Sequence, residues 1–325
     1  MNRRAFVARV GAVLAAPLGA KAQQAERVYR IGALSELPRY DPTVERWRRA
    51  FARRGYVEGQ NTIFEFRWGD GSGDTLRLRA AELVTLKLDI IMTTGHPASV
   101  AARKATATIP IVIMSADPLS DGLVATLGRP AGNVTGVFLP LADLAAKRVQ
   151  LMKELVPDLR SVAIVSNPNS STSRLQADSA ESAARVLRIT PHVVGLSSNS
   201  EAHVEKAFSA IVARGAKAVV VTQDAVTFQA SRAIAQLTAK HRLPSSYAYR
   251  EFAEAGGLMA YGTSLEENID LAAFAADRVL KGAKPADIPM LQPTKTELII
   301  NLKTAKALGL TIPQSLLLRA DQVIE

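Results

Sequence analysis

The sequence predicts an α/β protein built from two Rossmann-like lobes with parallel sheets joined by a hinge. Short continuous apolar runs, such as residues 90–92 and 109–114, alternate with helical segments such as residues 97–105. This alternation is typical of parallel strands that helices cover on both faces. The same pattern recurs along most of the chain, and its 325 residues suit two domains of medium size better than one.

The first lobe is predicted to span residues 28–134. Within it, Val44, Trp47 and Phe51 follow one another at helical spacing, and Gly55 ends that helix. We expect strands at residues 28–34, 62–68, 89–92 and 109–114, and helices at residues 43–54, 75–86 and 97–105.

The second lobe, residues 135–261, is predicted to repeat this organisation. Gly128, Pro130 and Gly132 break regular structure and indicate a connection between the lobes in residues 121–137. We expect helices at residues 141–156, 172–187, 201–213 and 226–241, and strands at residues 162–165, 189–196, 218–221 and 243–249.

The chain is then predicted to return to the first lobe. Residues 256–262 are interpreted as a strand that leads back, and the return segment 262–290 contains a helix at residues 265–280. Crossings near Val134 and Tyr261 would form the hinge. The C-terminal segment, residues 291–325, contains three further expected elements that fit either lobe.

Residues 1–22 are predicted to be an export signal peptide that is cleaved after Ala22. A charged start at Asn2-Arg3-Arg4 is followed by an apolar stretch and by the small-x-small site Ala20-Lys21-Ala22. The order Arg3-Arg4-Ala5-Phe6 is similar to a twin-arginine signal. The predicted location is the periplasm, and a disordered basic tail or an amphipathic anchor is the alternative.

Charge and cysteine content narrow the classes of function. The net charge of +10 falls to +6 without the predicted signal, which holds four basic residues and no acidic one. The other basic residues are spread over helices and not gathered with aromatic residues, which disfavours a nucleic-acid partner. The lack of cysteine excludes disulfides, thiolate metal sites, cysteine nucleophiles and a lipoprotein anchor. The four histidines lack the spacing of metal ligands, so we expect no metal and no cofactor.

Short polar groups follow the predicted strands of both lobes. In parallel sheets, ligands bind beyond the carboxyl ends of the strands, where such groups meet helix N-termini. Each of these residues alone is more often a helix cap than a ligand contact, but together they indicate the lining of a cleft. The candidate ligand-binding residues are Ser35, Tyr40, Thr94, Gly95, His96, Asp117, Asn167, Asp224, Tyr247 and Tyr249.

Catalysis is disfavoured by the same residues. Asp117 and Asp224 could form an acid/base pair, but carboxylates that accept from the ammonium or hydroxyl groups of a ligand are the simpler interpretation. No G-x-S-x-G elbow, P-loop or G-x-G-x-x-G motif follows a predicted strand. The sequence therefore predicts a binding protein and not an enzyme.

A series of short motifs connects the chain to a known family. In chain order they include Arg3-Arg4-Ala5-Phe6, Thr94-Gly95-His96-Pro97-Ala98, Ile109-Pro110-Ile111-Val112, Asp117-Pro118, Arg129-Pro130-Ala131-Gly132-Asn133-Val134-Thr135-Gly136, Glu254-Ala255-Gly256-Gly257-Leu258-Met259 and Ala307-Leu308-Gly309-Leu310-Thr311-Ile312-Pro313. Through essentially all of the chain after residue 22, it resembles the tryptophan-binding TrpX-like family of ABC-transporter substrate-binding proteins. The resemblance implies a type I periplasmic-binding-protein fold that closes on its ligand by a hinge.

The resemblance also implies roles for the strand-end residues. The helix that starts near Pro97 could offer free N–H groups to a ligand carboxylate. Asp117 or Asp224 could meet an ammonium group, and Tyr249 or Tyr40 could stack on an aromatic ring. Characterised relatives bind aromatic amino acids, so the expected ligand is an amino acid, with an aromatic one included, or a related carboxylate.

The expected function is that of a monomeric solute-binding protein that delivers its ligand to an ABC permease in the inner membrane. One alternative is a ligand-sensing periplasmic protein for a membrane receptor. Another is a two-lobed enzyme such as a racemase, but amino-acid racemases of this architecture use a cysteine pair, which the chain lacks. A repressor of related fold would need an N-terminal helix-turn-helix where the predicted export signal stands.

Overall fold

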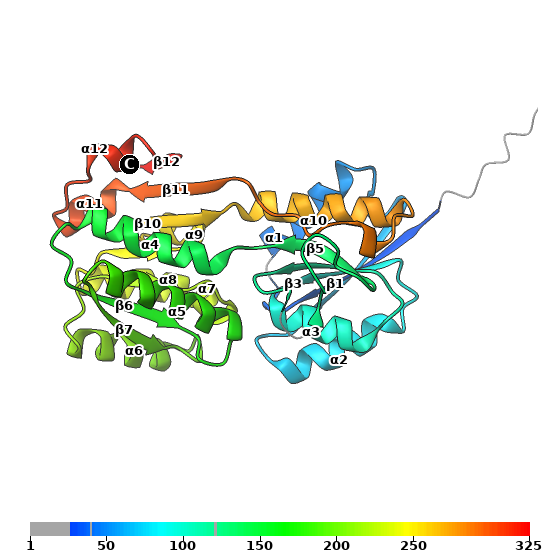
Figure 1. Cartoon of the computed structure of the whole chain (residues 1–325), viewed down its shortest axis with the longest axis horizontal. Helices are drawn as coiled ribbons and strands as arrows, with labels where there is room; N and C mark the ends of the chain where they lie inside the picture. Colours follow the sequence, from blue (N-terminus) through cyan, green and yellow to red (C-terminus); the bar gives the residue numbers. More distant parts are fainter. Residues whose placement is uncertain (1–26, 40, 120–121) are drawn as a thin grey trace, which may run out of the picture.

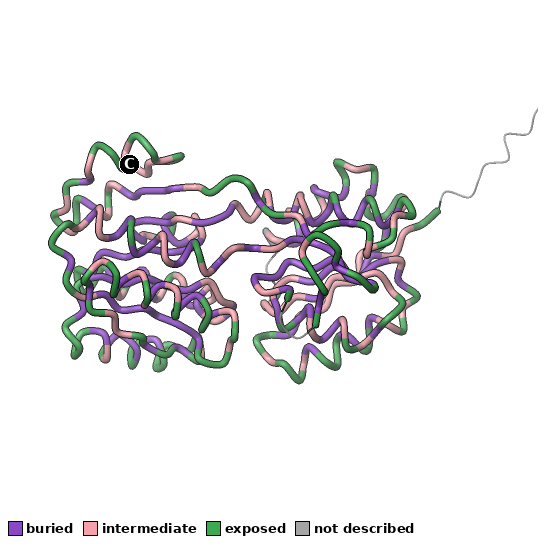
Figure 2. The backbone as a smooth tube through the Cα atoms, in the orientation of Figure 1, coloured by how far each residue is buried: buried purple, intermediate pink, exposed green. Residues whose placement is uncertain are grey.

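The computed structural model describes residues 27–39, 41–119 and 122–325, and within them two α/β lobes lie along the long axis of the molecule (Figure 1). The predicted signal peptide and Tyr40 lie outside the described residues. Each lobe is built around its own sheet, with buried strands and more exposed outer helices (Figure 2). The predicted fold class is confirmed.

The first sheet has five parallel strands in the order β2-β1-β3-β4-β5. They are β1 (Tyr29–Ser35), β2 (Thr62–Trp68), β3 (Ile90–Thr94), β4 (Ile111–Ser115) and β5 (Val134–Phe138). The helices are α1 (Asp41–Ala52), α2 (Gly73–Val84), α3 (His96–Ala105) and α10 (Leu265–Leu280).

Successive residues of the strands face two different apolar clusters, as the alternation of side chains in a strand requires. Ile90 faces the cluster formed with α1 and α10, whereas Ile91 faces the cluster formed with α2 and α3. Both residues are buried to at least 99%. This explains why the strands read as continuous apolar runs in the sequence.

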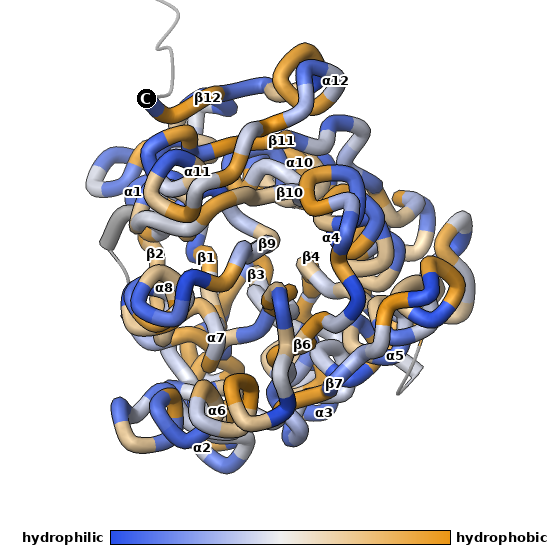
Figure 3. The backbone as a smooth tube through the Cα atoms, turned by 90° about the vertical axis from the view of Figure 1, so that its left-hand side faces the viewer, coloured by the Kyte–Doolittle hydropathy of each residue, from blue (hydrophilic) through white to orange (hydrophobic). Residues whose placement is uncertain are grey.

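The second sheet has seven strands in the order β12-β11-β10-β9-β8-β6-β7. They are β6 (Ser161–Ser166), β7 (Thr190–Gly195), β8 (Val219–Val221), β9 (Ser245–Tyr247), β10 (Met259–Thr263), β11 (Thr296–Asn301) and β12 (Gln322–Ile324). The helices are α4 (Leu141–Leu155), α5 (Ser171–Val186), α6 (Glu201–Ala213), α7 (Ala225–Gln229), α8 (Ser231–Lys240), α9 (Arg250–Glu254), α11 (Leu302–Leu308) and α12 (Gln314–Leu317). Seen from the end of this lobe, hydrophilic segments lie mainly around its periphery (Figure 3).

The structure differs from the sequence-based expectation in several elements. Residues 134–138 were expected to belong to the connection between the lobes or to the second lobe, but they form β5, the fifth strand of the first sheet. The strand expected at residues 243–249 is shorter and ends at Tyr247. The helix expected at residues 226–241 is divided into α7 and α8 at Ala230. The second sheet is not wholly parallel, because β11 pairs antiparallel with β10. β10 runs toward the first lobe and β11 comes back beside it, so their directions are opposite (Figure 1).

Three segments cross between the lobes. The first joins β5 to α4 through Leu139 and Pro140, the second joins β10 to α10 through Ser264, and the third, residues 289–295, leads back to β11. The third is tied to the first lobe by the N–H of Phe138, which donates to the carbonyl of Leu291 at 2.8 Å. β11 and β12 place most of the C-terminal segment in the second sheet. Of the helices in the described residues, none combines the length and the apolarity needed to cross a bilayer.

Candidate functional site

A pocket lies between the lobes, at the carboxyl ends of the strands in both sheets. It encloses about 810 Å³ of empty space, counting the part open to solvent. The first lobe contributes Glu36, Leu37, Thr43, Thr94, Gly95, His96, Met114 and Ala116; the second contributes Ser170, Thr172, Gln223, Asp224, Ala225, Phe228 and Tyr249; and the crossing segments and the helices after them contribute Leu139, Leu141, Leu265 and Asn268.

The floor of the pocket in the first lobe forms where β1 and β3 end. Gly95 precedes α3 with a φ of +94°, a conformation that glycine adopts without strain. A Cβ at this position would lie 2.3 Å from Cδ of Glu36, so only glycine lets the Glu36 carboxyl group lie here. Glu36 thus occupies space at the α3 N-terminus where we expected a ligand carboxylate, which disfavours that role for the helix.

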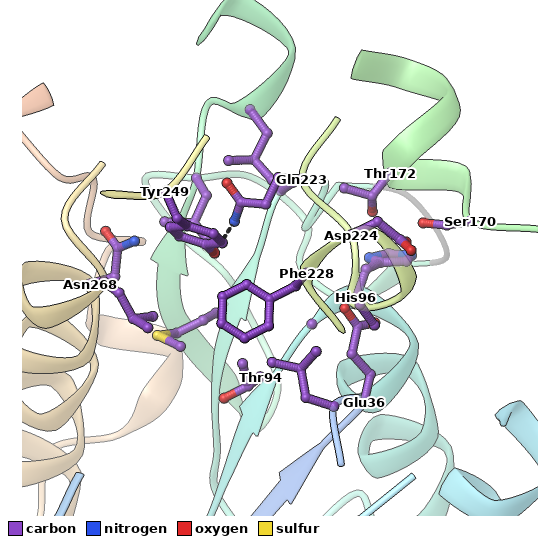
Figure 4. A pocket seen from close by; sticks show the side chains of 18 of the residues that line it. Glu36, Thr94, His96, Ser170, Thr172, Gln223, Asp224, Phe228, Tyr249 and Asn268 are labelled. Atoms are coloured by element: carbon purple, nitrogen blue, oxygen red, sulfur yellow. Dashed lines mark hydrogen bonds between the residues drawn. The ribbon is translucent and has the colours of Figure 1, made fainter. Parts of the chain in front are cut away.

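Two carboxyl groups from opposite lobes face the pocket on the same side (Figure 4). Asp224 caps α7: its Oδ1 accepts from the N–H of Val226 at 2.8 Å and from Nδ2 of Asn167 at 2.9 Å. Burial raises the pKa of Glu36 to about 8, and the charge of Asp224 adds to this rise. Since two carboxylates repel each other in a buried site, the pocket favours a ligand that brings a positive charge.

Aromatic rings form another part of the wall. Phe228 and Tyr249 meet edge to face, with ring centroids 5.8 Å apart and an interplanar angle of 87°. The Tyr249 hydroxyl accepts a hydrogen bond from Nε2 of Gln223. Burial also raises the pKa of Tyr249, so this hydroxyl is neutral at physiological pH. The wall can therefore contact an apolar or aromatic group and also offer polar atoms beside it.

Two polar atoms on the pocket wall are buried without a hydrogen-bond partner in the described part of the chain. They are Oγ1 of Thr172 and Oδ1 of Asn268. Nδ2 of Asn268 donates to Oγ1 of Thr263 at 2.9 Å, which fixes the orientation of the amide. An unpaired buried polar atom costs free energy, and a polar ligand could remove this cost.

Five of the ten candidate residues line the pocket: Thr94, Gly95, His96, Asp224 and Tyr249. His96 is buried, and its Nδ1 lies 3.1 Å from Oγ of Ser115.

Four others lie elsewhere. Ser35 borders a smaller neighbouring cavity, and its Oγ accepts from the N–H of Leu37. Asn167 does not line the pocket, but its Nδ2 donates to Oδ1 of Asp224, which does. Asp117 follows β4 but is absent from the lining. Tyr247 is fully buried in the second core, where its ring stacks on Phe252 at 4.7 Å between centroids.

Several residues of the pocket lining were not among the ten candidates predicted from the sequence. Glu36 is adjacent to the candidate Ser35, and Phe228 lies four residues after Asp224, one helical turn further. Asn268 had a visible signal, because it is a polar residue on the buried face of α10, next to the apolar Ile269. Nothing in the sequence showed that the start of α10 borders the pocket.

Two α/β lobes, three crossing segments and a pocket between the lobes define a hinged ligand-binding protein. The chain belongs to the family of ABC transporter substrate binding proteins, whose model matches residues 33–324. This confirms the resemblance seen in the sequence motifs.

The chain is similar to several characterised proteins. It is 28% identical over 281 residues to a tyrosine-binding protein of Clostridioides difficile strain R20291, covering 86% of this chain and 80% of that protein. It matches a crystal structure of an ABC domain in complex with L-Trp from Streptococcus pneumonia with a TM-score of 0.83 and 25% identity, covering 91% of this chain and 100% of that chain. A ligand-free, open substrate-binding protein from Clostridium difficile gives a TM-score of 0.67 at 24% identity, covering 91% and 99% of the two chains.

Proposed function

We propose that this protein is the periplasmic solute-binding component of an ABC importer and that it binds an amino acid, preferably an aromatic one, between its lobes. The observation that carries this proposal is the composition of the pocket. It combines two carboxyl groups, Glu36 and Asp224, with the aromatic pair Phe228 and Tyr249.

The carboxyl groups suit the ammonium group of the ligand. An ammonium between them would form charge-assisted hydrogen bonds with groups from both lobes. A ligand without a positive charge would leave Glu36 protonated and neutral, and it would gain no charge-assisted hydrogen bond from this group. Oδ1 of Asn268 is a further acceptor on the wall.

The aromatic pair suits an aromatic side chain. Phe228 and Tyr249 present ring surface to the pocket, and Leu37, Met114 and Leu265 extend the apolar part of the lining. The relatives that are named for tyrosine or solved with L-Trp support this preference. A related aromatic carboxylate is the next ligand class to test.

Closure of the lobes would trap the ligand and present it to a permease. The periplasmic location rests on the predicted export signal, residues 1–22. We propose no catalytic step. The acid/base pair of Asp117 and Asp224 that the sequence allowed is not formed in the pocket, because Asp117 lies outside its lining.

Isothermal titration calorimetry on the protein that begins at Gln23 tests this proposal. The panel holds L-tryptophan, L-tyrosine, L-phenylalanine, L-leucine, L-glutamate and indole-3-propionate. We expect the aromatic amino acids to bind most tightly, and a ligand at a hundred times its Kd to add about 2.7 kcal/mol to the free energy of unfolding. Phe228→Ala should weaken aromatic ligands about tenfold or more.

Phe274→Ala is the matched control, because Phe274 is exposed on α10 and does not line the pocket. It should bind like the wild type. Binding of indole-3-propionate in preference to every amino acid would overturn the role of the carboxyl groups. Absence of binding across the panel would overturn the proposed ligand class.

A further inference from the structure

Arg148, near the middle of α4, is the most unusual charged residue in the described part of the chain. Its side chain is fully buried, with 0% exposure. Nη1 donates to the carbonyl of Tyr261 at 3.2 Å, Nη2 donates to Oε1 of Gln176 at 3.4 Å, and Nε is buried without a partner. No carboxylate of the described residues forms an ion pair with it.

A buried guanidinium without a carboxylate partner is costly for a folded protein. Burial lowers the pKa of Arg148 to about 10, and the nearby Tyr249 opposes this fall. The group therefore remains charged at neutral pH. Its weak, long hydrogen bonds do not compensate for a full charge, so the fold carries a positive charge that its own contacts leave largely unmatched.

The charge lies directly behind the pocket wall. Oε1 of Gln176, which accepts from Arg148, also accepts from the N–H of Gln223 at 2.8 Å. Nε2 of Gln176 donates to the carbonyl of Gln223, also at 2.8 Å. Gln176 is itself fully buried and thus fixes Gln223 against Arg148. The side chain of Gln223 in turn donates to the hydroxyl of Tyr249, and both residues line the pocket.

The pocket is therefore polarised. Glu36 and Asp224 lie together on one side, and Tyr249 lies across from them (Figure 4). Arg148 stands behind the Tyr249 side, through the Gln176 and Gln223 contacts. An α-amino acid is a dipolar ion with a positive and a negative group, and this field suits it in one orientation only.

We propose that Arg148 is a positioning residue that orients a zwitterionic ligand, drawing its carboxylate to Gln223 and Tyr249 while its ammonium group meets Glu36 and Asp224. Arg148 acts through Gln223 and Tyr249 and does not touch the ligand. The inference rests on the proposed function and deepens it. It assigns the pocket to α-amino acids and disfavours amines of the same shape that lack the carboxylate.

Paired ligands test this role. L-tryptophan and tryptamine differ by the carboxylate alone, as do L-tyrosine and tyramine, and each is titrated into wild type, Arg148→Met and Arg148→Lys. Arg148→Met keeps an apolar chain in the buried site but removes the charge. We expect it to weaken both amino acids about tenfold or more and to leave both amines unchanged or slightly tighter. Arg148→Lys should recover most of the discrimination, because it keeps the charge.

A second variant guards against misfolding of Arg148→Met. Gln176→Glu keeps the arginine and places a carboxylate against it, so that the charge is cancelled in place, at the expense of the two hydrogen bonds that Nε2 of Gln176 donates to the carbonyls of Gln223 and Thr172. The same selective loss of amino-acid affinity is expected. Equal weakening of amino acids and amines in both variants, or no weakening in either, would overturn the role of Arg148 while the proposed function stands. Wild-type protein that binds no amino acid would overturn both.

Discussion

Arg46 on α1 and Glu251 on α9 belong to different lobes, and their side chains meet beside the pocket. Nη1 and Nη2 of Arg46 both donate to Oε1 of Glu251 at 3.0 Å. The two side chains are only 21% and 19% exposed, and they border a small cavity together with Tyr249 and Leu265. The contact joins the lobes at a place that the crossing segments do not reach, so it favours the arrangement of the lobes in this structure.

Arg46→Ala should shift the protein toward an open arrangement and weaken ligand binding. A partly buried ion pair of this kind contributes about 1 kcal/mol, which corresponds to about fivefold in Kd. The effect should shrink in high salt, because ions screen the pair. Calorimetry measures the change in Kd, and small-angle X-ray scattering should show a larger radius of gyration for the ligand-free variant.

Arg48→Ala is the matched control for this change. Arg48 lies on the same helix, but its ion pairs, with Glu45 and Glu58, stay within the first lobe. Its Kd and its radius of gyration should equal those of the wild type. If Arg46→Ala also behaves like the wild type, the contact between Arg46 and Glu251 does not favour closure.

Glu36 should make ligand binding depend on pH. Its pKa is raised to about 8 by burial, with Asp224 as the second cause, and Tyr249 and His96 are the other titratable groups of the lining. A ligand ammonium requires the ionised form, so the empty protein must lose a proton to bind below pH 8. Affinity for an amino acid should therefore rise from pH 6 to pH 8 and level off above it.

The stability of the empty protein should change in the opposite direction. Between the ordinary pKa of about 4.5 and the folded value of about 8, the folded state holds a proton that the unfolded state releases. Stability is therefore lost as the pH rises through this window. Glu36→Gln should abolish both trends and weaken amino-acid binding, whereas Glu254→Gln, a change at an exposed residue, should alter neither. Unchanged pH profiles in Glu36→Gln would contradict the assignment.

Tyr247 and Tyr249 should respond differently to the same substitution. The hydroxyl of Tyr247 lies 3.2 Å from Oγ1 of Thr238 inside the core, so Tyr247→Phe should cost about 1 kcal/mol of stability and leave Kd unchanged. Tyr249→Phe removes a hydroxyl from the pocket wall and should change Kd with little loss of stability. Thermal unfolding measures the stability of both variants, and calorimetry measures their Kd. A change of Kd in Tyr247→Phe alone would contradict the assignment of Tyr249, and not Tyr247, to the pocket wall.

The sequence alone could not distinguish the positions of Tyr247 and Tyr249. Both tyrosines lie in the strand predicted at residues 243–249, where two residues of spacing would place their side chains on one face. The strand ends at Tyr247, and Tyr249 begins the turn into α9, so the side chains separate. Such an end depends on tertiary contacts, and the sequence pattern does not contain it.

The fold was predictable because buried parallel strands produce continuous apolar runs, as in β3 and β4. The strand ends located Thr94, Gly95 and Asp224 correctly at the pocket. The position of the start of α10 at the pocket could not be predicted, because it depends on how the chain crosses again between the lobes. The buried charge of Arg148 was hidden for a different reason: on an amphipathic helix, an arginine is normally an exposed residue.

Asp270 should stabilise the return helix α10 at neutral pH and lose this effect in acid. Arg54 of the first lobe donates from Nη1 and Nη2 to Oδ1 and Oδ2 of Asp270, each at 2.8 Å, and this contact is the main reason that the pKa of Asp270 falls to about 2. A lowered pKa means that the stabilisation is present above the ordinary pKa and is lost as the pH falls toward 2. Since the Asp270 side chain is 40% exposed, solvent screening limits the contribution to about 1 kcal/mol or less.

Asp270→Asn should therefore lower the free energy of unfolding at pH 7 and lower it less at pH 2.5, where part of the stabilisation is lost. Urea unfolding at the two pH values measures the difference, with Asp287→Asn as the control at an exposed residue. The control should match the wild type at both values. An equal loss at pH 7 and pH 2.5 would mean that Asp270 acts through packing and not through its charge. The charge-based role predicts that the stability curves of wild type and Asp270→Asn converge as the carboxylate takes up its proton.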